Sequence, residues 1–360
     1  MRQGFLIAAI LTFLPMGGFT MFFKGVGALL LSLSLFSVFS MKCPKGDKAM
    51  SGLANAAITT FLVEAICKYI LGDFAGIEFF RNVGTASGNL GGSAAAVLVG
   101  ISMGTDPVMA VASGMALREF GILPGFIAGY LLHFLLYGIR KLPDGIKIIA
   151  GALLAAASAH GIAAFINPGV TAVIGIIGDA IIAATNQAPL MMGMLLGGIM
   201  KIVCTSPLSS MALTAMLQLT GLPMGIAAIA CFGGSFTNGM MFWKLGLGDG
   251  GRIAAVMLEP LTQADIITKN PVPVYFSNFF GGGFSGIVAA YLGIICNAPG
   301  TASPIPGMFA PFAFNAPDKV LAALLGAAIC GTLSGLASSV LFRFLDDRGI
   351  RSYRRAESLT

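Results

Sequence analysis

Charged side chains are scarce in this sequence. Only 10% of its 360 residues are Asp, Glu, Lys or Arg, whereas 56% are hydrophobic, and the mean hydropathy is +0.89. Because a soluble domain carries roughly 25% charged residues, this chain has too few polar groups to cover a water-exposed surface. Its apolar runs have the length of helices, not the alternating segments of roughly ten residues that form a membrane barrel. The composition therefore predicts an all-α polytopic membrane protein.

Paired cysteines and familiar catalytic signatures are also missing. The six cysteines are scattered without a CxxC spacing, so we expect neither a disulfide framework nor a metal site. The sequence has no GxxxxGK[ST] phosphate loop, no HExxH and no GxSxG elbow, which argues against ATP hydrolysis and against a cofactor. The net charge of +6 falls mostly in short loops and the C-terminus, a sign of membrane topology and not of nucleic-acid binding.

Two short basic loops predict the topology. KCPKGDK (42–48) and GIRKLPDGIK (138–147) have an excess of Lys and Arg, which marks loops on the cytoplasmic side. An apolar stretch at 4–23 leads directly into another at 25–41, without a convincing signal-peptide cleavage site. We therefore expect a retained first helix and both termini in the cytoplasm, including the basic tail 346–360.

Residues 1–345 are expected to form one membrane-embedded unit with about ten to twelve apolar segments. Several of these, such as 107–120, are shorter than the roughly 20 residues that a full crossing needs, and we expect half-helices or re-entrant hairpins there. Residues 105–128 also align without gaps on 205–228. Inverted repeats with broken helices are typical of transporters and place the substrate near the bilayer midplane. A chance match between glycine-rich apolar stretches is the alternative.

The segment Arg252–Tyr275 is the strongest polar interruption of the apolar pattern. Its middle holds Glu259, Gln263 and Asn270 among three prolines. An unpaired carboxylate at membrane depth costs a few kcal/mol or more, so Glu259 should meet a partner, a proton or a hydroxyl-bearing ligand. Gln263, one turn later, lies on the same face if this piece is helical. The alternative is a plain loop between spans, where polar residues need no further purpose.

Two other stretches are candidates for a ligand site. In GGSFTNGMMFW (233–243), Thr237 and Asn238 follow two glycines, which suits an unwound helix whose backbone meets a ligand. The alternative is a helix end near the interface. Asn89, in SGNLGGS, makes a similar but weaker case. The segment 297–314 carries four prolines and cannot be a plain helix; it is either a loop folded in near the site or an ordinary connector.

The two histidines, His133 and His160, lie in apolar or small-residue surroundings. A buried histidine can relay protons or bind a substrate. It can equally be satisfied by a neighbouring carbonyl group, so the sequence leaves both interpretations open.

Three stretches together resemble a known family: FRNVGTASGNLGGSAAAVLVGISMGTDPVMAVASGMALREFG, LEPLTQADIITKNPVPVY and NAPGTASPIPGMFAPF. They are similar to the membrane-embedded IIC components of the bacterial phosphoenolpyruvate-dependent sugar phosphotransferase system, in the branch that includes the clostridial perfringolysin O regulator protein. The likeness covers most of the chain, from about Gly52 to Phe344. By this match Glu259 takes the position of the sugar-binding glutamate.

The resemblance implies an inner-membrane homodimer in lipid, with a scaffold and a mobile transport domain. Such a protein binds a sugar, moves it inward and presents it to a phosphorylated IIB partner, which IIA supplies. The chain has no phosphoryl-transfer site of its own, so it would act only as part of a phosphotransferase complex. The alternative is a membrane sensor or regulator that transports nothing. The expected substrate-binding residues are Glu259, Gln263, Asn238, Thr237, Asn89, His160, His133 and Asn270.

Overall fold

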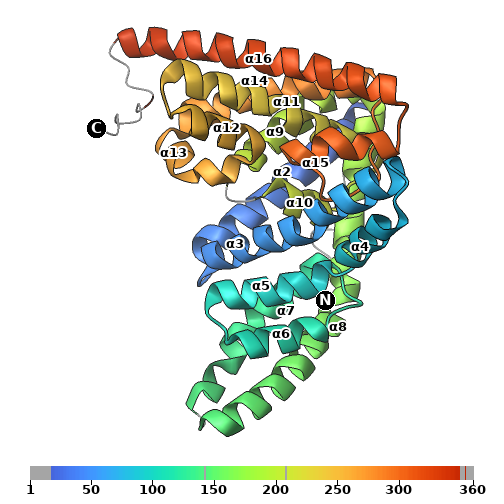
Figure 1. The fold of residues 1–360 in the computed structure, drawn as a ribbon, viewed down its shortest axis with the longest axis vertical. Coiled ribbons are helices and arrows are strands. Elements are labelled where there is room, and N and C mark those ends of the chain that lie inside the picture. Colours follow the sequence, from blue (N-terminus) through green and yellow to red (C-terminus); the bar gives the residue numbers. More distant parts are fainter. Residues whose placement is uncertain (1–17, 142, 207–208, 349–352, 354–360) are drawn as a thin grey trace. The chain divides into compact units, whose positions relative to one another are not determined.

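The protein is mostly helical in the residues that its computed structural model describes, which are 18–141, 143–206, 209–348 and 353 (Figure 1). No β-strand occurs among them. Within these residues, six helices are long and apolar enough to cross a membrane, or seven if the bent pair Glu78–Gly88 and Gly91–Met103 counts as one span. This confirms the prediction of an all-α polytopic membrane protein.

The expected count of ten to twelve segments is not supported within the described residues. One reason is α8 (Asp144–Gln187), a single helix that continues through Pro168. A proline inside a membrane helix is tolerated because neighbouring groups satisfy the freed carbonyl, so the apolar stretches on either side of Pro168 form one segment and not two. A second reason is that α6 (Pro107–Met115) and α10 (Ser210–Met216) are too short to cross. Most of the predicted first span 4–23 lies outside the described residues, and its last residues, 18–23, form the beginning of α2 (Gly18–Lys42). Most of the predicted tail 346–360 also lies outside the described residues.

The chain divides into two compact units. Unit 1 holds residues 27–180 and 211–218 with the beginning of the chain, and unit 2 holds 21–26, 181–210 and 219–360. The helices of unit 1 are most of α2 (Gly18–Lys42), α3 (Gly46–Ala57), the π-helices η1 (Ile58–Leu62) and η2 (Ala65–Phe74), α4 (Glu78–Gly88), α5 (Gly91–Met103), α6, α7 (Ile122–Leu135), the 3-10 helix η3 (Leu136–Lys141), most of α8, and α10 except its first residue, Ser210.

Small residues set the packing of unit 1. A Cβ at Gly125 of α7 would collide with the carbonyl of Gly92 on α5, so these two helices approach as closely as their backbones allow. Around this contact, buried side chains from α5 to α8, including Leu117 and Leu132, form an apolar core. The chain bends by 57° between α4 and α5, at the glycine-rich stretch whose composition predicted an interruption.

Unit 2 is built around α14, which packs on α9, α11 and α16. Its helices are α9 (Pro189–Thr205), α11 (Gly221–Leu245), α12 (Gly250–Leu258), the 3-10 helix η4 (Pro260–Gln263), α13 (Ala264–Lys269), α14 (Pro271–Tyr291), α15 (Pro304–Phe309), the 3-10 helix η5 (Ala310–Ala313) and α16 (Pro317–Asp347). The polar segment Arg252–Tyr275 is thus broken into short pieces, as its prolines and polar residues predicted.

The expected unwinding at 233–243 is wrong, because α11 continues through the whole stretch. Its glycines serve packing. A Cβ at Gly233 would collide with Ser285 of α14, and a Cβ at Gly234 would collide with the side chain of Lys201. Glycine here lets neighbouring groups reach the helix surface without opening the backbone.

The two copies of the suspected repeat have the same local structure. In the first copy α5 is followed by the short α6 and the longer α7; in the second, α9 is followed by the short α10 and the longer α11. α7 begins at Ile122 and α11 at Gly221, close to equivalent positions of the alignment. The order of these helices therefore agrees with the repeat, although α7 has 14 residues and α11 has 25.

Candidate functional site

Glu259 lies where the chain breaks between α12 and η4. The hydroxyl of Ser303 donates a hydrogen bond to its Oε2 at 3.2 Å, and the backbone N–H of Leu261 donates another. Ser303 directly precedes α15, in the proline-rich stretch 297–314. The two segments that the sequence singled out for their prolines and polar residues therefore meet at this carboxylate.

Lys201 of α9 supplies the positive charge of this region. Its side chain is fully buried, with 0% exposure, and its aliphatic part runs between Gly234 and Gly282, where a Cβ on either glycine would collide with it. Its Nζ donates to the carbonyl oxygen of Cys231 at 3.3 Å. A buried ammonium group with one hydrogen bond is costly, so its presence calls for a further role.

Burial raises the pKa of the Glu259 carboxyl above its ordinary value. The hydrogen bonds from Leu261 and Ser303 and the positive charge of Lys201 oppose this rise in the pKa. Glu259 lies outside the candidate membrane spans. The charge of Lys201 thus stabilises the ionised form of Glu259 from a distance. Within the described residues, Lys201 forms no ion pair at contact distance.

Three interruptions of the helices meet around these charges. Ser210, which follows α9, donates from its hydroxyl to the carbonyl of Ala302 at 2.5 Å. The thiol of Cys204 interacts with Cys231, Ser210 and the two charged groups. We call Lys201, Ser210, Glu259 and Ser303 the unit 2 polar centre. Lys201 comes from α9 and Ser210 from the first residue of α10. Glu259 directly follows α12, and Ser303 directly precedes α15.

Gln263 and Asn270 lie on the short pieces that follow Glu259. Gln263 is half-buried at the end of η4, and its Nε2 donates to the hydroxyl of Thr262 at 3.4 Å. Asn270 is buried, and its Nδ2 donates to the carbonyl of Ile266 at 3.0 Å, which closes α13. The side chain of Asn270 therefore serves the turn into α14.

Asn238 and Thr237 are both buried on α11. The hydroxyl of Thr237 donates to the carbonyl of Gly331 on α16 at 3.0 Å. Asn238 accepts at Oδ1 from Nδ2 of Asn278 on α14 at 2.8 Å. The other two amide atoms of this pair, Asn238 Nδ2 and Asn278 Oδ1, have no hydrogen-bond partner in the described part of the chain.

This pair lies one helical turn from Lys201. The lysine packs on Gly234 and Gly282, and Asn238 and Asn278 follow four residues further along α11 and four residues back along α14. The unpaired amide donor and acceptor therefore belong to the same polar interior as the unit 2 polar centre.

The remaining predicted site residues, Asn89, His133 and His160, belong to unit 1. Asn89 is exposed at the bend between α4 and α5. His160 is exposed, and its Nδ1 lies 2.9 Å from the carbonyl oxygen of Ala116. This contact meets the hydrogen-bonding need of one ring nitrogen without a ligand.

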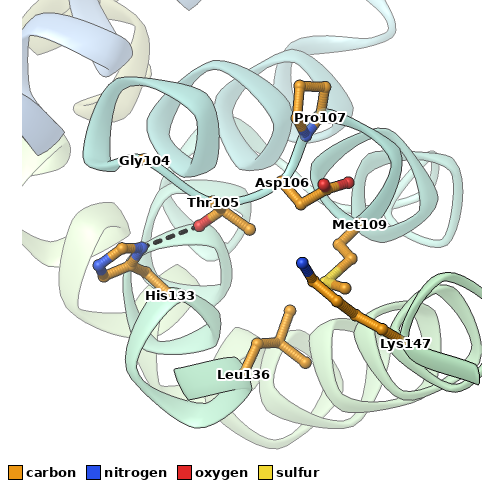
Figure 2. A pocket seen from close by; sticks show the side chains of 8 residues that line it. All are labelled: Gly104, Thr105, Asp106, Pro107, Met109, His133, Leu136 and Lys147. Carbon is orange, nitrogen blue, oxygen red and sulfur yellow. Dashed lines mark hydrogen bonds between the residues drawn. The ribbon is translucent and has the colours of Figure 1, made fainter. Parts of the chain in front are cut away.

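His133 is buried on α7 and lines a cavity (Figure 2). Its Nδ1 lies 3.0 Å from the hydroxyl of Thr105, and its Nε2 lies 2.7 Å from Nζ of Lys45. A lysine ammonium can only donate, so Nε2 accepts and the ring proton is on Nδ1, from where it is donated to Thr105. His133 is therefore a neutral link between a cation and a hydroxyl.

Sequence reasoning missed Lys201 and Ser303. Lys201 is the only charged residue in the apolar run of α9, and an ionisable residue inside such a run is a functional-site hypothesis by default, so the signal was available. Ser303 had no signal beyond its place in 297–314, because serine is common in connectors.

Broken helices that meet around buried charges, in a polytopic helical protein, are an arrangement typical of membrane transporters. The family model described as phosphotransferase system, EIIC, matches residues 47–354, and the chain belongs to this family. The resemblance stated from the sequence is thereby confirmed. No curated protein and no solved structure gives a significant match to the chain.

Proposed function

We propose that the protein is a permease of the EIIC type, which binds a sugar or sugar-like solute at the unit 2 polar centre and moves it inward. The observation that carries the proposal is that Glu259, which accepts from Ser303, and the buried Lys201 belong to the same centre, where the charge of Lys201 acts on the carboxyl group. A carboxylate only accepts hydrogen bonds and an ammonium only donates them. A solute hydroxyl does both and can satisfy each group.

The surroundings extend this match to a solute with several hydroxyls. Asn238 and Asn278 leave one amide donor and one acceptor unpaired, which again suits a hydroxyl group. Gln263, on the piece that follows Glu259, is a further amide for the solute. A neutral solute also fits the charges, because Lys201 and ionised Glu259 balance each other.

Family membership supports the wider proposal. The protein would work in the bacterial inner membrane as a homodimer, and separate IIB and IIA proteins would phosphorylate the solute. The chain's own contribution to phosphoryl transfer would be to hold the hydroxyl in place at the cytoplasmic end of its path.

Uptake into proteoliposomes tests the proposal, over a panel of sugars and with and without a phosphorylated IIB protein. We expect Glu259→Gln and Asn238→Ala each to lower uptake of the accepted solute by about tenfold or more. Glu119→Gln is the control, because Glu119 is an exposed carboxylate of unit 1. Wild-type uptake in both site variants would refute the site, and solute binding without uptake would refute transport in favour of a sensor.

A further inference from the structure

Unit 1 contains a cavity of about 380 Å³ that the proposed transport site does not use (Figure 2). Its volume falls in the range of small-molecule sites. It lies between the connection from α5 to α6, the end of α7 and the beginning of α8. The residues that line it are Gly104, Thr105, Asp106, Pro107, Met109, His133, Leu136 and Lys147.

A chain of hydrogen bonds with one direction ends at this cavity. Lys45 donates to Nε2 of His133, and Nδ1–H of His133 therefore donates to Oγ1 of Thr105. Because Oγ1 of Thr105 accepts this hydrogen bond, the O–H group of Thr105 remains available as a donor. Within the described residues, no acceptor bonds to this O–H group. Thr105 is buried at 7% exposure, so that acceptor has to be a molecule in the cavity.

The charged groups around the cavity favour an anion. Lys147 lines it directly, and in Figure 2 its ammonium group reaches in from α8 toward the side where Thr105 and Asp106 lie. The ammonium group of Lys45 polarises Thr105 through His133, since hydrogen bonds in a chain strengthen one another. Among the described residues of the lining, Asp106 is the one carboxylate, and its Oδ1 accepts from the N–H of Val108 as the cap of α6.

The rest of the lining is mixed. Met109 and Leu136 give the cavity an apolar surface, and the second oxygen of Asp106 can accept from a hydroxyl group. A ligand that suits all of these groups is small, carries a negative group for Thr105 and Lys147, and has hydroxyl groups beside an apolar face.

We propose that this cavity binds a sugar phosphate, with the phosphate group held by the Thr105 hydroxyl and the Lys147 ammonium group. His133 acts as a positioning residue that orients the Thr105 proton toward the ligand. Lys45 and Lys147 belong to the two basic loops that the sequence places on the cytoplasmic side, where a phosphorylated product would appear. The choice of a sugar phosphate among hydroxylated anions rests on the proposed function; the cavity would then report product accumulation to the permease.

Isothermal titration calorimetry on the detergent-purified full chain tests the proposal. The probes are hexose 6-phosphates, the corresponding free hexoses and inorganic phosphate. We expect saturable binding of at least one hexose phosphate, with weaker binding of inorganic phosphate. Thr105→Val and Lys147→Gln should each weaken the hexose phosphate by about tenfold or more, because each removes a charge-assisted or polarised hydrogen bond. Lys48→Gln is the matched control, an exposed lysine of the same basic loop as Lys45.

The positioning role of His133 has a separate readout. Gln can accept from Lys45 and donate to Thr105 as histidine does, whereas Leu cannot. We expect His133→Leu to lose affinity for the hexose phosphate and His133→Gln to recover a large part of it. Equal losses in the two variants would overturn the positioning role.

Three outcomes would each overturn the binding site. The first is that no hexose phosphate shows saturable binding, and the second is that its affinity is unchanged in Thr105→Val and Lys147→Gln. The third is that inorganic phosphate binds as tightly as the hexose phosphates. The two proposals have separate readouts. Hexose phosphate binding in Thr105→Val and Lys147→Gln tests this cavity, and free-sugar uptake in Glu259→Gln tests the transport site.

Discussion

Replacement of Lys201 by methionine separates the stability of unit 2 from its binding function. Methionine keeps most of the aliphatic volume that fills the space between Gly234 and Gly282, but it removes the ammonium group. The variant Lys201→Met therefore tests whether the buried charge serves the fold or the ligand.

The expected effect on stability follows from the contacts of the charge. Lys201 is fully buried and makes one hydrogen bond of 3.3 Å, to a neutral carbonyl. Replacing buried charged groups by apolar residues of similar volume is often neutral or stabilises a protein by about 1–4 kcal/mol. Here Glu259 loses a favourable charge, which offsets part of the gain, so we expect unfolding stability to be unchanged or raised by about 1–2 kcal/mol.

The expected effect on binding is opposite in sign. A hydrogen bond to a charged group contributes about 1.5–3 kcal/mol, so loss of the ammonium group should weaken solute binding by roughly tenfold to a hundredfold. Differential scanning fluorimetry gives the first quantity, and equilibrium binding of the accepted sugar gives the second. A clear loss of stability with unchanged binding would refute the reasoning, because Lys201 would then be a structural residue.

Further variants test neighbouring contacts. Because burial raises the pKa of Glu259, solute binding should weaken as the pH falls, with a midpoint above the ordinary pKa of glutamate. In Glu259→Gln, a binding titration should no longer show this loss of binding at low pH. The raised pKa also means that the contribution of Glu259 to unfolding stability is largest below its ordinary pKa and is lost as the pH rises through the raised value; chemical denaturation across this range checks the sign. Gly234→Ala should cost about 1–3 kcal/mol in unfolding free energy, since its Cβ would displace the side chain of Lys201, whereas Gly161→Ala, which meets open space, should stabilise by up to about 1 kcal/mol. Thr237→Val should destabilise by about 1 kcal/mol, because it removes the side-chain hydrogen bond between α11 and the Gly331 carbonyl of α16, and the same denaturation assay measures it.

The sequence predicts the class of fold and the main interruptions of the helices well, because these depend on composition and on local backbone chemistry. Prolines and polar residues break the chain around Glu259, and the glycine-rich stretch before α5 bends it, as expected. The number of crossings is less predictable. Pro168 looks like a helix end in the sequence, yet α8 passes through it.

The roles of single polar residues depend on partners that are distant in the chain. The hydroxyl of Thr237 bonds to Gly331, 94 residues away, and Asn238 bonds to Asn278, 40 residues away. No local pattern reveals such pairs. Glu259 could be proposed because a carboxylate among prolines is unusual in an apolar chain, but its neighbour Ser303 could be placed beside it only by the structure.

The packing of Lys201 between two glycines also has an electrical consequence. A lysine near a helix end can extend its charge to the membrane surface, but this one is enclosed between the two glycines. In the proposed transport step its charge would therefore move with the centre. While Glu259 is ionised, the two charges cancel, and displacement of the empty centre across a membrane potential would do almost no electrical work. Once Glu259 takes up a proton, one positive charge remains, and the same displacement would be coupled to the potential by up to about 2.3 kcal/mol per 100 mV, the limit for a charge that crosses the whole membrane. The protonation state of one carboxyl group would thereby decide whether the conformational step is sensitive to voltage.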